Sequence, residues 1–174
     1  MRPTRPGRWP QGRAEGGVNN TGGGIQFGDY ILGQEDPKDN YVYGYLITPT
    51  ASGNLGSIGA PIGDLSGSSA SVTFYVYTNN DGAPGTLLDT LTATVGTFTP
   101  YVVSPITVFA STKHPFLSSE QSYWVIASSS AAEIGWDANN TVPSTNTYNA
   151  DNGEPIYGPC CGLEGALTLT ATAG

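Results

Sequence analysis

The sequence predicts an all-β protein, an antiparallel two-sheet sandwich of jelly-roll type with an extended N-terminal arm. Short segments alternate apolar and polar residues with a period of two, as strands do when they cover a core on one side. Glycine (24) and proline (13) are abundant among the 174 residues, which is typical of many strands joined by tight turns. No long segment keeps the 3.6-residue period of an amphipathic helix.

The chain divides into an arm, residues 1–24, and a single β-domain, residues 25–174, whose length suits one hydrophobic core. The arm is rich in Gly and Pro and nearly lacks aliphatic residues. It is therefore either a disordered tail or an extended segment that becomes ordered on a partner. The candidate partner-binding residues of the arm are Arg2, Arg5, Arg8, Trp9 and Arg13.

The net charge of −8 is unevenly distributed. All four arginines lie in the first 13 residues, whereas Lys38 and Lys113 alone oppose the 14 carboxylates that follow. Such an acidic domain repels nucleic acid and anionic lipid, so only the arm is expected to bind an anionic surface. The N-terminus lacks the apolar core of a signal peptide, and no apolar run is long enough to span a membrane.

The predicted strands follow one another between turn signals. They cover residues 41–48, 71–78, 87–95, 99–110, 122–129, 132–138 and 166–173. The turn signals are GDLSGSS (63–69), NNDGAPG (79–85) and DNGEP (151–155). The glycine-rich segment 52–63 is predicted to be a long loop, and it lacks the Lys-Ser/Thr pair of a phosphate-binding loop. Trp124 and Trp136 are each flanked by aliphatic residues and are predicted to be buried.

Tyrosines occupy one side of two predicted strands. If Val72, Phe74 and Val76 point into the core, the tyrosines between and beside them point outward. The expected outward set is Tyr41, Tyr43, Tyr45, Tyr75 and Tyr77. These residues have three interpretations: pairing across strands, an interface with another subunit, or stacking on the sugar rings of a glycan.

No catalytic constellation is recognised, and the chain is predicted not to be an enzyme. The single histidine, His114, precedes a proline and is interpreted as a surface loop residue. Cys160 and Cys161 are adjacent, so they are either two reduced thiols or a vicinal disulfide. No cofactor is expected. The alternative is a structural Ca²⁺ held by the loop oxygens of residues 35–40 or 79–82.

Three segments from the second predicted strand to Trp136 form a recognisable pattern: SVTFYVYTNNDGAPGTLLDTL (71–91), PITVFASTKHPFLSSEQSYWVIASS (105–129) and IGWD (134–137). This pattern resembles the choice-of-anchor R domain, a β-sandwich module of bacterial surface and secreted proteins. The resemblance extends over about residues 30–173. It implies a sandwich fold and supplies no catalytic residues. The residues that carry it are Asp81, Gly82, Pro84, Gly85, Leu87, Leu88, Tyr123, Trp124 and Trp136.

These observations predict a non-enzymatic structural or display protein. Its arm is expected to dock it on the anionic surface of a larger protein assembly, on copies of itself, or on both. The expected location is the surface of a virion, as a capsid decoration, head fibre or tail protein, by analogy with similar sandwich domains that an N-terminal arm fixes to phage capsids and tails. The alternative is a carbohydrate-binding or adhesion module that is secreted or lies on a bacterial cell surface.

Overall fold

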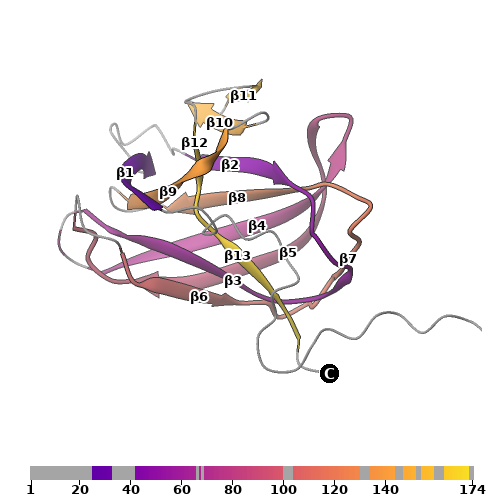
Figure 1. Cartoon of the computed structure of the whole chain (residues 1–174), viewed down its shortest axis with the longest axis horizontal. Helices are drawn as coiled ribbons and strands as arrows, with labels where there is room; N and C mark the ends of the chain where they lie inside the picture. Colours follow the sequence, from indigo (N-terminus) through magenta and orange to yellow (C-terminus); the bar gives the residue numbers. More distant parts are fainter. Residues whose placement is uncertain are drawn as a thin grey trace, which may run out of the picture.

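Alternating apolar side chains build two antiparallel sheets that pack against each other (Figure 1). The structure is a computed structural model. It describes residues 25–32, 42–65, 67, 69–99, 104–129, 134–143, 147–151, 154–158 and 163–172. These ranges contain thirteen strands and no helix. The all-β prediction is confirmed for this part of the chain, whereas the predicted arm lies outside it.

The first sheet has seven strands and is organised around one long strand, β3. Its path is β1 (Ile25–Leu32), β9 (Ile134–Pro143), β3 (Gly53–Asp64) and β13 (Thr168–Ala171). Three shorter strands join it: β12 (Leu163–Gly165) pairs with β9, while β6 (Ile106–Ala110) and β7 (Phe116–Leu117) pair with β3. Strands from all parts of the described chain therefore meet in one layer.

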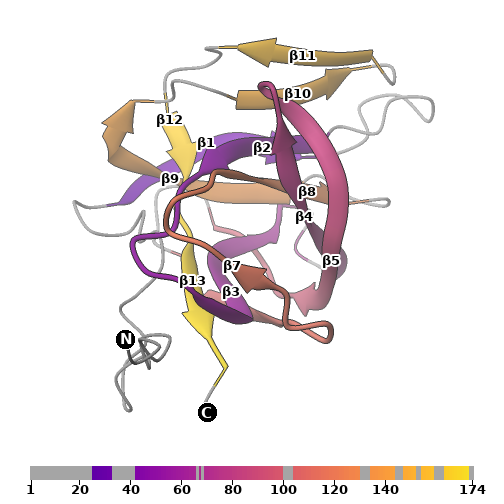
Figure 2. The ribbon, with the colours of Figure 1, turned by 90° about the vertical axis from the view of Figure 1, so that its right-hand side faces the viewer.

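The second sheet has six strands and lies on the other side of the core. In spatial order they are β11 (Glu154–Gly158), β10 (Thr147–Asp151), β2 (Val42–Ile47), β8 (Tyr123–Ser129), β4 (Ala70–Asn80) and β5 (Ala83–Val95). Figure 2 shows β3 and β13 of the first sheet on one side and β4 and β5 of the second on the other. The predicted strands at 71–78, 87–95 and 122–129 correspond to β4, β5 and β8.

The hairpin of β4 and β5 turns at the predicted signal 79–85. Asn80 pairs with Ala83, and the two residues between them, Asp81 and Gly82, have φ angles of +50° and +89°. Two left-handed residues in a two-residue loop match the right-handed twist of the flanking strands. Asn79 Oδ1 accepts a hydrogen bond from the Gly82 amide at 3.0 Å, which closes the turn.

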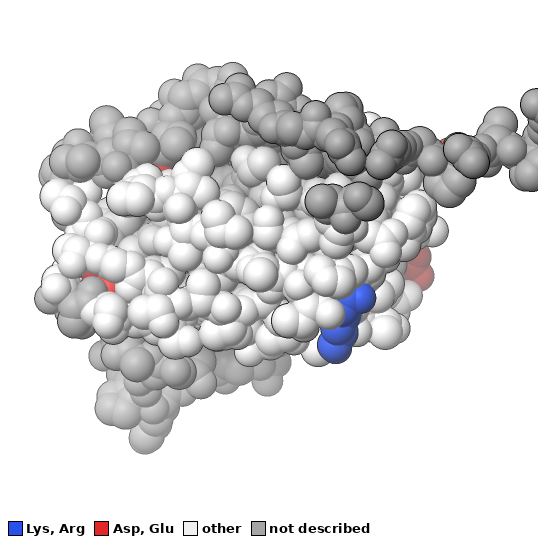
Figure 3. Space-filling view, turned by 90° about the horizontal axis from the view of Figure 1, so that it is seen from below, with Lys and Arg blue, Asp and Glu red and all other residues white. Residues whose placement is uncertain are grey.

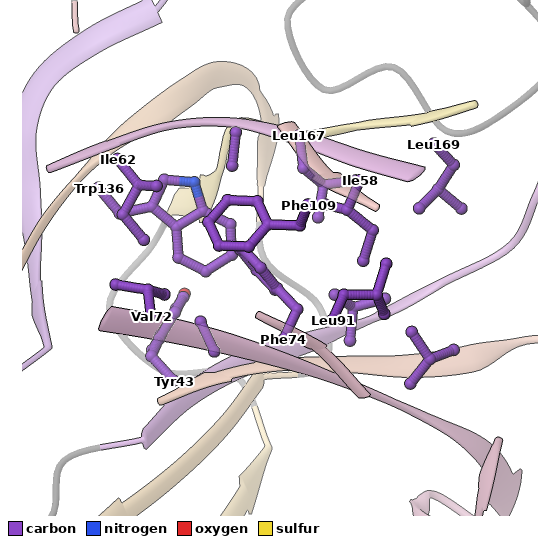
Figure 4. Packing of buried hydrophobic residues seen from close by; sticks show 14 of the residues in the cluster. Tyr43, Ile58, Ile62, Val72, Phe74, Leu91, Phe109, Trp136, Leu167 and Leu169 are labelled. Carbon is purple, nitrogen blue, oxygen red and sulfur yellow. The ribbon is translucent and has the colours of Figure 1, made fainter. Parts of the chain in front are cut away.

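The core lies between the two sheets and is centred on aromatic contacts (Figure 4). Phe74 of β4 meets Phe109 of β6 and Trp136 of β9 edge-to-face, with ring centroids 4.7 and 5.3 Å apart. Such pairs add about 0.5–1.5 kcal/mol to the burial of their area. These contacts hold the inner face of the second sheet against that of the first.

Trp136 is fully buried and is fixed by the residues around β12. Its Nε1 donates a hydrogen bond of 2.8 Å to the Ala166 carbonyl oxygen, so its polar atom is satisfied. Gly165 lies against the indole, and a Cβ atom there would be 2.3 Å from Trp136 Cε2. Only glycine therefore fits at position 165 without movement of the ring.

The glycine-rich segment 52–63 is a strand, and its prediction as a loop is wrong. Most of it forms β3, which pairs with β6, β7, β9 and β13. Leu55, Ile58, Ala60 and Ile62 are buried, with an irregularity in register between Leu55 and Ser57. The intervening glycines suit close neighbours: a Cβ at position 56 would be 2.6 Å from the backbone of Ala171. Close packing, rather than loop formation, explains this composition.

Tyr43 and Tyr45 point into the core, which corrects the expectation that they face outward. They pair with Ala127 and Val125 of β8, and residues that pair directly lie on the same side of a sheet. Both rings contact Trp136, with centroids 6.1 and 5.8 Å away, and the Tyr45 hydroxyl donates to the Gly165 carbonyl oxygen. A hydroxyl with a buried acceptor allows tyrosine to replace an aliphatic residue here.

Replacing Gly165 with alanine tests this packing. We expect Gly165→Ala to lower the free energy of unfolding by about 1–3 kcal/mol, because the added methyl group overlaps the indole of Trp136. Gly96→Ala is the matched control, since no atom lies within 4 Å of its added Cβ, and its effect should stay within about 0.5 kcal/mol. Urea unfolding of both variants measures the difference. Equal midpoints would contradict the described contact.

Candidate functional site

Two of the five predicted outward tyrosines form an exposed aromatic pair on the second sheet. Tyr75 and Tyr77 alternate with the buried Phe74 and Val76 along β4, so their rings lie on the outer face. Their ring centroids are 6.3 Å apart and their planes differ by 32°. Both rings are partly exposed. Their predicted outward orientation is confirmed, and Tyr41 lies outside the described residues.

The neighbouring strand β8 supports this pair from the side. Tyr77 pairs with Trp124 and Tyr75 pairs with Ile126. Trp124 is buried, as predicted, but on the outer side of the sheet rather than in the central core, and Ile126 is buried beside it. Trp124 Nε1 donates a hydrogen bond of 3.2 Å to Asn79 Oδ1 and so ties β8 to the end of β4. The exposed part of the aromatic face is therefore the tyrosine pair.

A row of hydroxyl groups continues the same face along β4 and β5. Thr73 lies two residues before Tyr75 on the outer side of β4 and pairs with Thr92 of β5, with their hydroxyl oxygens 3.0 Å apart. Thr94 is exposed one step further along β5. The face thus changes from aromatic rings to hydroxyl groups along one pair of strands.

This outer face carries no charge within its strands. The residues of β4 and β8 include no Lys, Arg, Asp or Glu, and β5 has one, Asp89. Asp89 pairs with Val76 on the inner side and is fully buried. The arrangement suits a neutral ligand with both apolar and hydroxyl surfaces.

The buried Asp89 anchors the connection between β6 and β7. Its carboxylate accepts hydrogen bonds from the Ser111 hydroxyl and, at 2.8 Å, from the Thr90 amide. Ser111 Oγ also accepts from the His114 amide at 2.9 Å. His114 is exposed with φ +48°, which agrees with its interpretation as a surface loop residue. Its Nδ1 lies 3.0 Å from the Leu55 carbonyl oxygen.

A second buried carboxylate, Asp137, has one satisfied and one unsatisfied oxygen. Its Oδ2 accepts a hydrogen bond of 2.7 Å from the Ser104 amide. Asp137 Oδ1 and Ser104 Oγ are both buried and have no hydrogen-bond partner among the residues that the structure describes. An ordered water would satisfy such atoms.

The predicted Ca²⁺ loops gain no metal-binding geometry from the described residues. Within the described ranges no three His, Cys, Asp or Glu side chains come together as metal ligands. Asn79 Oδ1 already accepts two hydrogen bonds, from Gly82 and Trp124. The other candidate loop, residues 35–40, lies outside these ranges, as do Cys160 and Cys161.

A hollow beside Leu55, Leu117 and Leu169 has a volume of about 10 Å³, the space of one water molecule.

The opposite sheet presents a different outer face, which the alternation pattern of the sequence does not predict. Ile106 and Val108 of β6 and Phe116 of β7 are 57%, 61% and 57% exposed. They alternate with the buried Phe109 and Leu117, so all three lie on the outer side of the first sheet. Figure 3 shows the molecule from this side, with a surface that is almost free of charge. Each face of β6 carries a large apolar residue, Phe109 on one side and Ile106 and Val108 on the other, so alternation alone did not identify the exposed face.

The arm residues predicted to bind a partner, Arg2, Arg5, Arg8, Trp9 and Arg13, lie outside the described residues. Lys38 also lies outside them, so Lys113 is the only Lys or Arg in the described ranges. It lies in the connection between β6 and β7, next to His114. The contrast between the basic arm and the acidic domain is therefore drawn from the amino-acid sequence and not from the structure.

The phenol of Tyr77 should lose its proton at a higher pH than that of a free tyrosine. Burial, and secondly the neighbouring Tyr75, raise the pKa of Tyr77 above its ordinary value of 10.0. Folding thus favours the neutral phenol, and this stabilisation is complete below about pH 10 and is lost as the pH rises through the raised pKa. Subtracting the phenolate absorbance titration of Tyr77→Phe from that of the wild type isolates this group. A midpoint at or below the ordinary value would contradict the prediction.

Tyr75→Phe is the matched control for this titration. It removes the second cause of the shift and leaves most of the burial, so the midpoint of Tyr77 should fall only part of the way towards the ordinary value.

Comparison with known proteins gives no relative from which a function can be carried over. No family model, no curated protein and no solved structure matches the chain. Among the described residues, no helix is long and apolar enough to cross a membrane.

Proposed function

We propose that this chain is a non-enzymatic structural protein that is displayed on a larger protein assembly, in the first instance a virion. In this proposal the domain is a jelly-roll-like sandwich that serves as a capsid decoration, head fibre or tail protein. The arm docks the domain on an anionic surface of the assembly. One sheet face of the domain then lies against the assembly or against a neighbouring copy.

The observation that carries this proposal is the exposed apolar side of the first sheet. Single exposed apolar residues are normal on soluble proteins, but several on one uncharged face are typical of an interaction surface. Ile106, Val108 and Phe116 lie on the same side of adjoining strands. The strands that carry them, and β13 beside β3, contain no charged residue. A protein surface that covers these side chains would remove apolar area from water.

The charge distribution supports docking through the arm. The first 13 residues contain four arginines and no carboxylate, whereas the rest of the chain is strongly acidic. An arm of this charge is attracted to an acidic partner surface, whereas the acidic domain that follows it disfavours a close approach to the phosphates of nucleic acid. Trp9 among the arginines supplies a large apolar side chain, the residue type that most often anchors an interface.

Deleting residues 1–24 tests the docking. In density gradients of lysate from the producing cells, we expect the full chain to sediment with particles and the deletion variant to stay in the soluble fraction. Replacing all four arginines with glutamine should have the same effect, because the arm then loses all four of its positive side chains. Lys113→Gln is the control, since it removes a positive charge from the β-domain only. If the full chain sediments with no particle, or if the deletion variant still does, the proposal fails.

The apolar face gives a second, independent test. Ile106→Thr with Val108→Thr keeps two β-branched residues on β6 and makes their exposed ends polar, so stability should change by less than about 1 kcal/mol in total. Association with the particles should weaken at least about tenfold, measured by the fraction that sediments with them. Leu87→Thr is the control, because Leu87 is 40% exposed but lies on β5 of the other sheet. Equal effects of the two changes would contradict a role for this face.

A further inference from the structure

We propose that the outer face of β4 and β5 binds an extended neutral glycan. This goes beyond docking on an assembly, since it assigns a ligand to the opposite side of the domain. Tyr75 and Tyr77 are the proposed stacking residues, and Thr73 and Thr92 are the proposed hydroxyl contacts. Asn79 and Trp124 position the aromatic end of the face.

The tyrosine pair has the geometry of a stacking platform. The two rings project from alternate positions of one strand, so they follow each other along β4 and not across the sheet. Their tilt of 32° leaves both ring faces turned in a similar direction. An apolar ring face is complementary to the C–H face of a pyranose, and two of them in a row contact successive sugars of one chain. The strand direction therefore sets the direction of the bound chain.

The platform is rigid, which reduces the entropy cost of binding. Trp124 and Ile126 are 1% and 5% exposed and pack beside the tyrosines on the paired strand β8. Gly44, opposite Ile126 on β2, leaves space for that side chain, since a Cβ at position 44 would be 2.8 Å from Ile126 Cγ1. Preorganised side chains lose little freedom when a ligand binds. Tyrosine also has only two side-chain torsions to fix.

The polar groups next to the rings fit sugar hydroxyls. The hydroxyl pair of Thr73 and Thr92 continues directly from Tyr75, and each hydroxyl both donates and accepts hydrogen bonds. Sugar hydroxyl groups have the same double capacity. Because the strands of this face expose no charge, it offers nothing to the phosphates of a nucleic acid or to an acidic glycan. A neutral ligand with alternating C–H and hydroxyl surfaces is the class that uses all of these features.

The test is affinity electrophoresis of the full chain in gels that contain hydroxyethyl cellulose, galactomannan or xylan, followed by calorimetry with the hexasaccharide of the polymer that retards it most. We expect retardation by at least one polymer. Tyr75→Ala and Tyr77→Ala should each weaken binding by about tenfold or more, because each removes one stacking ring. Tyr75→Phe and Tyr77→Phe keep the rings and should retain most of the affinity.

The remaining variants separate this site from the rest of the molecule. Phe116→Ala, on the opposite face, and deletion of residues 1–24 should leave glycan affinity unchanged, so glycan binding and particle docking are judged independently. Equal melting temperatures of wild type and Tyr75→Ala exclude unfolding as the cause of a loss. The proposal is overturned if none of the polymers retards the chain, or if the alanine variants bind as tightly as the wild type. It is also overturned if the alanine changes only dissociate an oligomer, because the face is then a protein interface.

Discussion

The burial of one large side chain, Trp136, is the constraint on which the rest of the structure depends. An indole at the centre of a two-layer core needs a flat neighbour, a hydrogen-bond acceptor and aromatic edges around it. The structure supplies these from Gly165, the Ala166 carbonyl and Phe74, which belong to segments distant in sequence. Close-packed interiors tolerate little change in volume, so each of these partners is fixed by the others. The inward orientation of the β2 tyrosines follows from the same requirement.

This arrangement gives the domain two outer faces of different chemistry. One sheet turns apolar side chains outward along β6 and β7, and the other turns tyrosine rings and hydroxyl groups outward along β4 and β5. Because a single core lies between the sheets, these faces point away from each other. A protein held on an assembly by the first face would present the second to its surroundings. The proposed display function and the proposed glycan site are therefore compatible in one molecule.

The sequence predicted the all-β, antiparallel character of the described chain, the β4–β5 hairpin and the burial of both tryptophans, because local alternation and turn chemistry determine them. It did not predict that β3 is a strand, since its glycines reflect close contacts with distant segments. Ala171 of β13 lies against Gly56, and Gly96 and Phe98 lie against Gly63. The side of β2 that faces the core was also missed. Alternation defines two sides of a strand but does not say which side is inner when both are apolar or aromatic. The outward orientation of Tyr75 and Tyr77 was predicted correctly, because Val72, Phe74 and Val76 between and beside them are wholly apolar and mark the inner side of β4.

The hydrogen bond between Tyr45 and Gly165 spans 120 residues of sequence, and this separation has a consequence for synthesis in the cell. At a translation rate of about 5–20 residues per second, Tyr45 waits roughly 6–24 s for its acceptor to be made. During this interval the inner faces of β2, β4 and β8 have no complete opposite sheet. Apolar strands left open in this way are prone to join other chains. The nascent chain should therefore depend on ribosome-associated chaperones far more than the finished protein depends on any chaperone.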